Sequence, residues 1–263
     1  MSTRQTLTEG LPNGKGQQVL RKLQTREVDI DDYCAIGTND ALLDDIVAAI
    51  LKHRLFATPE EQIKRLLEIN EVLWKDIAIT EAAIRALGDP PECPPSDENG
   101  LYCVCLFFEV GDAVKTFERN WQACVQVHGQ DGTWKWDGVL FTPKGVKQRD
   151  GVMLRRPGLR WQVAELGRQF KGKSVSNVRP QLKVMGMGQE LPFVAALHPK
   201  WAVSMNGDGI PYVDAPDLEV APSAGGEFSD APYLDFYRDD RLVDLRARRI
   251  EYSSSYYGSG SLQ

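Results

Sequence analysis

The eight residues Gly167–Ser174 match the spacing of a phosphate-binding loop, G-x-x-x-x-G-K-S. In such a loop, backbone N–H groups and the Lys surround phosphate oxygens, and the Ser hydroxyl binds magnesium. The flanking sequence does not supply the rest of the motif, because Leu159–Leu166 carries charged and amide side chains where a buried strand is required, and Pro180 interrupts the following helix. Nucleotide hydrolysis through Gly167–Ser174 is therefore an alternative hypothesis, and a surface loop is the preferred interpretation.

This loop lies inside a basic segment, residues 143–183, which contains 11 Lys and Arg against Asp150 and Glu165 in a chain of net charge −6. Either the segment neutralises acidic parts of the same protein or is a solvated surface, or it binds a polyanion, which gains free energy by releasing counterions. Nucleic acid and an acidic protein surface are the candidate partners. The candidate polyanion-binding residues are Arg155, Arg156, Arg160, Trp161, Arg168, Lys171 and Lys173.

Zinc-binding side chains make the third candidate site. Cys103 and Cys105 would share one face of a strand, and Cys124 and His128 would share one face of another. However, C-x-C inside an apolar strand is typical of two small buried side chains. On a strand, Cys124 and His128 would also lie about 13 Å apart, too far for a nucleophile and its base. We therefore expect no metal and no cofactor, and a zinc-stapled domain stays a second alternative.

These candidates depend on residues 101–141, which have the densest β-branched and aromatic content of the chain. The nearly continuous apolar run Leu101–Val110 predicts a strand buried on both faces. Apolar and polar side chains alternate over residues 121–128, which predicts a half-buried strand. The turn residues Gln130–Gly132 then predict a hairpin with a returning strand.

Helical patterns precede this stretch. Apolar residues recur at helical spacing over residues 42–51. Thr58-Pro-Glu-Glu61 forms a capping box and predicts the start of a long helix that ends at Gly88, with Thr80 as a second cap that would divide it. Both features indicate a helical hairpin or three-helix unit before the sheet.

The remainder is predicted to mix short helices and strands. Helical periodicity appears over Val163–Phe170, Ser174–Val184 and Pro192–Met205. Tyr233–Tyr237 and Leu242–Leu245 flank a polar turn and predict a tight hairpin.

We therefore predict an α+β fold in which an N-terminal helical unit is followed by a mostly antiparallel β-sheet with short helices. The expected divisions are a tail at 1–16, a helical subdomain at 17–88, a linker at 89–100, an α+β domain at 101–252 and a flexible tail at 253–263.

Composition sets the expected compartment and class. No uncharged apolar segment approaches the roughly 18 residues of a membrane helix, so we expect no membrane partner. Five cysteines without regular spacing indicate reduced thiols and a cytoplasmic protein. The preferred functional hypothesis is a non-catalytic cytoplasmic binding or interaction protein that uses the basic segment.

Two C-terminal stretches, ALHPKWAVSMNGDGIPYVDAPDLEV and APYLDFYRDDRLVDLR, carry a resemblance. The chain resembles uncharacterised hypothetical proteins of uncultured bacteria with small genomes over about its last 130 residues. The resemblance implies a bacterial origin and transfers no site residue.

Overall fold

Helix α4 (Pro59–Leu73) begins where the sequence predicts, and in the computed structural model its cap is complete. Glu61 N–H donates to Thr58 Oγ, and Thr58 N–H donates to the Glu61 carboxylate at 2.8 Å. The helix ends at Leu73, and Thr80 caps a second, short helix α5 (Glu81–Arg85). The predicted division at Thr80 is therefore confirmed.

The structure describes residues 54–152, 155–182, 185–206, 209–223 and 226–263. Within it, Leu55–Gln263 forms one compact unit. The predictions for the tail at 1–16, the helix at 42–51 and the rest of the segment before residue 54 lie outside the described residues. Residues 89–100 contain neither helix nor strand.

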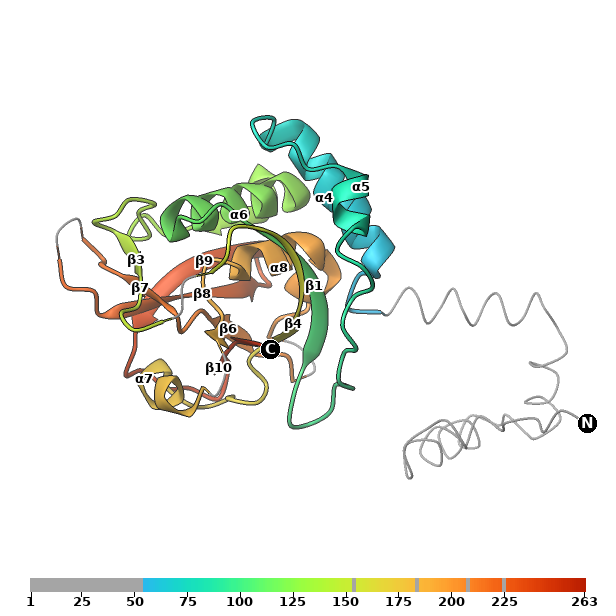
Figure 1. The fold of residues 1–263 in the computed structure, drawn as a ribbon. Helices are drawn as coiled ribbons and strands as arrows, with labels where there is room; N and C mark the ends of the chain where they lie inside the picture. Colours follow the sequence, from blue (N-terminus) through green and yellow to red (C-terminus); the bar gives the residue numbers. More distant parts are fainter. Residues whose placement is uncertain (1–53, 153–154, 183–184, 207–208, 224–225) are drawn as a thin grey trace, which may run out of the picture. The chain divides into compact units, whose positions relative to one another are not determined.

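The described strands form two sheets, shown in Figure 1. The four-stranded sheet has the order β1-β4-β11-β5, and all its pairs are antiparallel. In the seven-stranded sheet the order is β10-β6-β8-β7-β3, with β9 on β8 and β2 on β9. Only the β10–β6 and β2–β9 pairs of this described sheet are parallel. The predicted α+β class with mostly antiparallel sheets is confirmed.

The strands are β1 (Tyr102–Glu109), β2 (Thr133–Lys135), β3 (Val146–Gln148), β4 (Gly158–Glu165), β5 (Met185–Gly186), β6 (Tyr212–Asp214), β7 (Leu218–Val220), β8 (Asp230–Tyr237), β9 (Leu242–Arg249), β10 (Tyr257–Ser259) and β11 (Ser261–Leu262).

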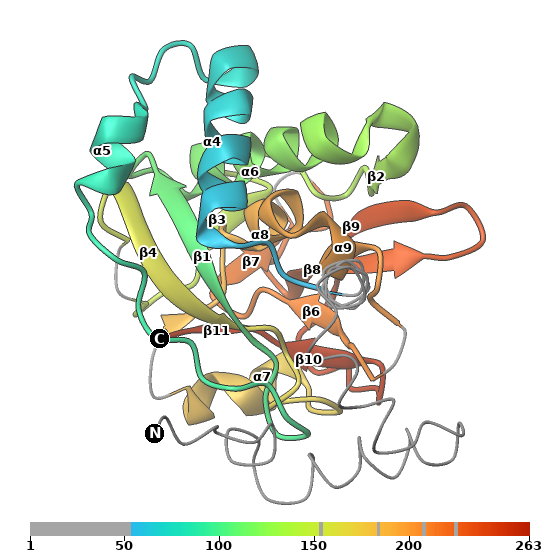
Figure 2. The same cartoon turned by 90° about the vertical axis from the view of Figure 1, so that its right-hand side faces the viewer.

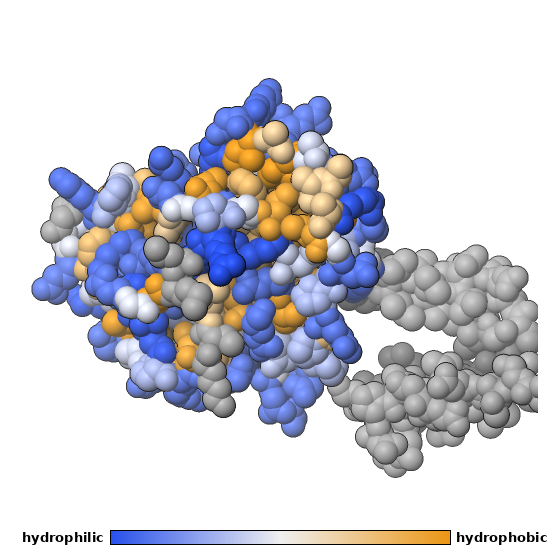
Figure 3. Space-filling model, in the orientation of Figure 1, coloured by the Kyte–Doolittle hydropathy of each residue, from blue (hydrophilic) through white to orange (hydrophobic). Residues whose placement is uncertain are grey.

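Helix α8 (Leu191–Leu197) lies at the centre of the core. All seven of its residues are buried, and it contacts α6 (Ala113–His128), β1 and β8. Helix α4 packs on β1 and α6, as Figure 2 shows. Apolar residues also gather at the surface over α4, α5 and the adjoining end of α6 (Figure 3), where Val72 and Leu87 are exposed. The remaining short helices are α7 (Val175–Val178), α9 (Pro199–Ala202) and the 3-10 turns η1 (Gln130–Gly132) and η2 (Arg179–Gln181).

The predicted strand at residues 121–128 is wrong, because these residues belong to α6. Asp112 caps this helix by accepting from Lys115 N–H, and Gly129 ends it with a φ of 83°. The buried residues Phe117, Trp121 and Cys124 recur at helical spacing. The alternation over 121–128 was a short coincidence inside a longer helical pattern. The predicted hairpin also fails, because β2 pairs with β9 instead.

Two further predictions are corrected. Val163–Phe170 is not a helix, because its first three residues belong to β4, which pairs along its whole length with β1, and the other five lie in irregular backbone, bends and turns. Residues 253–263 are not a frayed end either. They contain β10 in the seven-stranded sheet and β11 in the four-stranded sheet, and Gly258–Leu262 is buried. The predicted hairpin of Tyr233–Tyr237 and Leu242–Leu245 is confirmed as β8 and β9.

Candidate functional site

The predicted polyanion-binding arginines Arg155 and Arg160 lie together, Arg155 buried and Arg160 half-buried, and both bind carboxylates of the same protein. Arg155 Nε donates to Glu190 at 2.9 Å, its Nη1 donates to Asp217 at 3.2 Å and its Nη2 donates to the Gly186 carbonyl at 2.7 Å. Arg160 Nη2 donates to the same Glu190 oxygen at 3.1 Å. These cations neutralise internal carboxylates, so their charge is not free for an external polyanion.

Two further residues, Glu109 and Arg149, contact the same network of charges. Glu109 Oε2 lies 3.6 Å from Arg160 Nη2, and Arg149 lies 3.5 Å from Asp217. We call the group Arg149, Arg155, Arg160, Glu109, Glu190 and Asp217 the Arg155 cluster. Its three arginines face three carboxylates, so the charge is balanced.

The other predicted residues are more exposed. Arg156 and Lys171 are exposed, and Arg168 donates to the Asp97 carbonyl at 2.7 Å. Trp161 is half-buried and packs against the hydrophobic core. Lys173 donates to Gln181 Oε1 at 3.0 Å and lies over the Phe170 ring. The structure therefore divides the predicted set into two arginines that bind internal carboxylates, Arg155 and Arg160, and a second group that includes residues of the loop after β4.

Backbone N–H groups of the loop Gly167–Ser174 bind a carboxylate of the same protein. Glu165 is fully buried, and its carboxylate accepts from the N–H groups of Gly167 and Gln169 at 3.0 and 2.9 Å. Burial raises the pKa of Glu165, and these hydrogen bonds oppose the rise. Ser174 Oγ accepts from Asn177 N–H and caps α7, which has only four residues. These contacts give no support to nucleotide hydrolysis through this loop.

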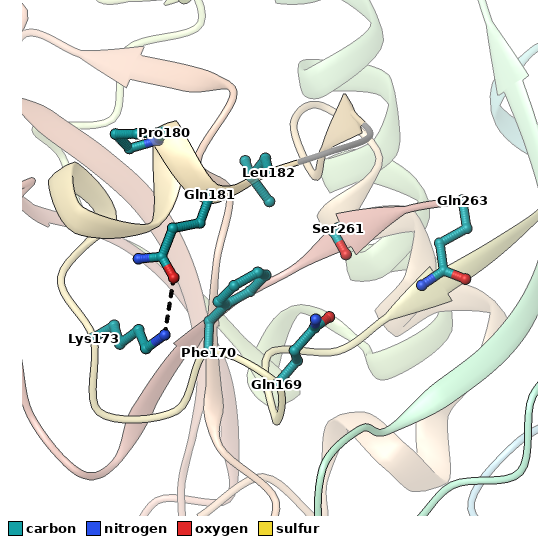
Figure 4. Close-up of a pocket in the computed structure, with 8 residues that line it drawn as sticks. All are labelled: Gln169, Phe170, Lys173, Pro180, Gln181, Leu182, Ser261 and Gln263. Atoms are coloured by element: carbon teal, nitrogen blue, oxygen red, sulfur yellow. Dashed lines mark hydrogen bonds between the residues drawn. The ribbon is translucent and has the colours of Figure 1, made fainter.

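A cavity of about 820 Å³ lies beside the same loop. Figure 4 shows the Phe170 ring between the Lys173–Gln181 hydrogen bond and the Gln169 amide. A second cavity of about 430 Å³ shares two of its lining residues, Leu182 and Gln263. The larger cavity is lined by Gln169, Phe170, Lys173, Pro180, Gln181, Leu182, Ser261 and Gln263. Among the described lining residues, three carry side-chain amides and one, Lys173, is a cation.

The cysteines are arranged differently from the zinc hypothesis. Cys124 and His128 lie one helical turn apart on α6, and His128 Nε2 lies 3.1 Å from the Ala195 carbonyl. Cys103 and Cys105 instead meet His198, the residue between α8 and α9. Their two Sγ atoms are 3.5 Å apart, and Cys105 Sγ is 3.3 Å from His198 Nε2. The potential ligand atoms of Cys103, Cys105 and His198 all lie within 4.8 Å of one another.

The hydrogen bonds of His198 oppose metal binding in this arrangement. Ala57 N–H donates to His198 Nδ1 at 3.0 Å, so in the neutral ring the hydrogen is on Nε2, toward Cys105. A metal ligand would need the Nε2 lone pair and normally donates from its other nitrogen. Burial also raises the pKa of Cys103, which favours the thiol. The group therefore fits a hydrogen-bonded pair of core thiols.

One site was missed by the sequence reasoning: a pair of aspartates on the hairpin of β8 and β9. Asp235 and Asp244 lie directly opposite each other in the register, so their side chains share one face of the sheet. The opposite face carries Leu234 and Leu245, which belong to the core. The signal was available, because the predicted hairpin with its turn at residues 238–241 already places Asp235 opposite Asp244.

The neighbours of this pair are aromatic and basic. Trp134 of β2 lies opposite Asp244, and Tyr233 lies opposite Arg246. Arg246 donates to Asp244 Oδ2 from Nε at 3.1 Å and from Nη2 at 2.5 Å, and its guanidinium lies over the Trp134 ring.

The pair itself is buried and incompletely bonded. Asp235 is 7% exposed and Asp244 is 1% exposed. The Oδ1 atoms of both have no hydrogen-bond partner among the described residues. Burial, and then the charge of Asp244, raise the pKa of Asp235 to about 7.

Farther along the same face, a third buried aspartate is fully paired. Asp214 accepts from Arg248 Nε and Nη2 at 3.0 and 2.7 Å, and the Arg248 guanidinium lies 3.6 Å from the centre of the Tyr257 ring. Burial raises the pKa of Asp214 to about 6, although Arg248 opposes the rise. Both carboxylate oxygens of Asp214 therefore have a hydrogen-bond donor, and we assign this aspartate a structural role.

Comparison with known proteins adds no assignment: no protein-family model, curated protein or solved structure matches the chain. Among the described residues, no helix is long and apolar enough to cross a membrane.

Proposed function

We propose that the protein is a non-catalytic binding protein whose ligand site is the cavity beside Phe170 and Lys173. The observation that carries the proposal is the size of this cavity, about 820 Å³, and its position in the basic segment. Pockets of about 300–1,000 Å³ are the usual size for small ligands.

The lining indicates the chemistry of the ligand. Lys173 supplies the one cation of the described lining, and it is exposed. The amides of Gln169, Gln181 and Gln263 supply both hydrogen-bond donors and acceptors, which suits the edge of a base or a sugar. A single nucleotide unit, either free or at an end of single-stranded nucleic acid, combines these groups with an anion. We also propose a cytoplasmic location, which is supported by the free thiols of the four described cysteines.

The first prediction tests this site. Calorimetric titration with a nucleoside monophosphate and with a 5′-phosphorylated oligothymidine should show binding that Lys173→Ala weakens by about tenfold, the loss expected for one charge-assisted hydrogen bond. Lys171→Ala is the matched control, because Lys171 is on the same loop but does not line the cavity. Binding of the monophosphate would identify a free nucleotide, and binding of the oligonucleotide alone would identify a strand end.

Two results contradict the proposal. If Lys171→Ala and Lys173→Ala weaken binding equally and with a steep dependence on salt, the anion binds the outer surface of the basic segment. If neither probe binds at millimolar concentration, the cavity is not a nucleotide site.

A further inference from the structure

The Asp235–Asp244 pair differs from Asp214, whose two carboxylate oxygens both accept from Arg248. Among the described residues, Arg246 is the cation that contacts the pair, and its hydrogen bonds go to a single oxygen, Asp244 Oδ2. With both carboxylates ionised, the three groups sum to one negative charge. Two buried oxygens, Oδ1 of Asp235 and Oδ1 of Asp244, remain without a partner in the described part of the chain.

Two buried carboxylates that face each other need a further positive charge, either a proton or a bound cation. Directly opposed side chains on antiparallel strands have Cβ atoms about 4.5–5.5 Å apart, a separation at which like charges destabilise the sheet. Leaving a buried acceptor unsatisfied costs about 1–3 kcal/mol, and more when it is charged. Either a proton or a metal cation between the carboxylates removes both costs.

The ligand atoms and their position favour a hard divalent cation. Asp235 and Asp244 offer carboxylate oxygens, and oxygen ligands select magnesium, manganese and calcium over soft metals. Magnesium is commonly held by one or two carboxylates while water completes its octahedron. The pair is also close to solvent, because its neighbours Trp134 and Tyr237 are 41% and 44% exposed.

We propose that Asp235 and Asp244 together bind one hard divalent cation, Mg²⁺ or Mn²⁺, through their Oδ1 atoms, with water as the remaining ligands. Arg246 then positions Asp244 by holding its other oxygen. None of these three residues lines the cavity beside Phe170 and Lys173, so the cation site does not depend on the proposed ligand of that cavity.

Carboxylate ligands must be deprotonated to bind a metal, so the titration is made at pH 8.

The second prediction uses Mn²⁺ as the probe, followed by electron paramagnetic resonance of the full chain. At pH 8 the wild type should take up one equivalent of Mn²⁺, and Asp235→Asn or Asp244→Asn should weaken this by about tenfold or more, as expected for loss of an anionic ligand. Asp239→Asn, in the exposed turn of the same hairpin, is the control and should bind as the wild type does. Mg²⁺ should compete with Mn²⁺ in the wild type.

Several outcomes would overturn the site. Unchanged Mn²⁺ affinity in both variants places the metal elsewhere. Absence of uptake by the wild type at pH 8 shows that the pair holds a proton only, and this result is decisive even if the variants do not fold. A further check is thermal unfolding, in which Mn²⁺ should raise the midpoint of the wild type but not that of Asp244→Asn.

Discussion

The Arg155 cluster and the Asp235–Asp244 pair are both buried groups of charge, but they differ in how their carboxylates are neutralised. In the Arg155 cluster, Arg155 donates to two carboxylates and a carbonyl, and Arg160 shares one of these acceptors. In the aspartate pair, two like charges face each other and a single arginine contacts one of them. In the Arg155 cluster the arginines and carboxylates bind one another and connect distant segments. In the aspartate pair the excess negative charge can be neutralised by a bound cation.

The comparison also shows why basic composition was a poor guide to function. Residues 143–183 carry a large local excess of positive charge, yet two of the candidate arginines bind carboxylates of the same protein. The hairpin of β8 and β9 has no net charge, because its residues 230–249 contain five Asp and five Arg, yet Asp235 and Asp244 contact only one of these arginines among the described residues. Net charge along the sequence therefore did not show where the unpaired charge lies.

The third prediction concerns the Arg155 cluster, where a substitution should lower the free energy of unfolding the most. Arg155→Ala leaves Glu190 and Asp217 without their main cation, and breaking a buried ion pair from one side costs about 3–5 kcal/mol. Urea denaturation should show this loss in the free energy of unfolding. Arg156→Ala is the matched control, because the adjacent Arg156 is exposed and should leave the denaturation midpoint unchanged. Equal effects of the two substitutions would remove the distinction between them.

A fourth prediction concerns the dependence of stability on pH in metal-free buffer. The pKa of Asp235 rises from an ordinary value of 3.8 to about 7 on folding, so the folded state binds the proton more tightly. This residue therefore favours folding at low pH, and its contribution is lost as pH rises through about 7. The upper bound on that loss is about 4 kcal/mol.

The isosteric variant Asp235→Asn isolates this contribution. Its stability relative to the wild type should increase between pH 4 and pH 8, measured by denaturation at each pH, while Asp214 and Glu165 titrate in both proteins. A difference that does not change with pH would mean that Asp235 is not protonated in the folded state near neutral pH.

The fifth and smallest effect is expected from Arg246→Ala. This change removes the pair's cation, but Arg246 is partly exposed, so the loss at pH 8 should be about 1 kcal/mol. The loss should shrink at pH 5, where protonation lowers the charge of the pair. A larger loss at pH 5 than at pH 8 would show that Arg246 acts through its packing on Trp134 and not through its charge.

Local signals were sufficient for part of the fold. The capping box at Thr58 and Glu61 and the second cap at Thr80 depend on residues only three apart, and both are present. The hairpin of β8 and β9 was likewise predicted from its turn, and its register places the aspartate pair.

The remaining features depend on distant partners. Arg155 reaches Glu190 and Asp217 at separations of 35 and 62 residues, which no local pattern records. Likewise, the predicted helix Val163–Phe170 overlaps the end of β4, which is a strand because β1 pairs with it from Tyr102 to Glu109. The zinc hypothesis named Cys103 and Cys105, which are two of the three grouped residues. The third is His198 and not Cys124 or His128, because the latter two lie on helix α6 and not on a neighbouring strand.

The last strands have a consequence for the order of folding. Residues 257–259 complete the seven-stranded sheet and residues 261–262 pair with β4 and β5 of the other, with Gly258 so close to Gly167 that a Cβ at Gly258 would lie 1.8 Å from its carbonyl oxygen. Contacts between residues so far apart in sequence form late, because a large loop must close first. During synthesis on the ribosome, the edges of β4, β5 and β6 that pair with residues 257–262 would therefore stay open until these residues emerge, and their pairing with other chains is the hazard of that interval.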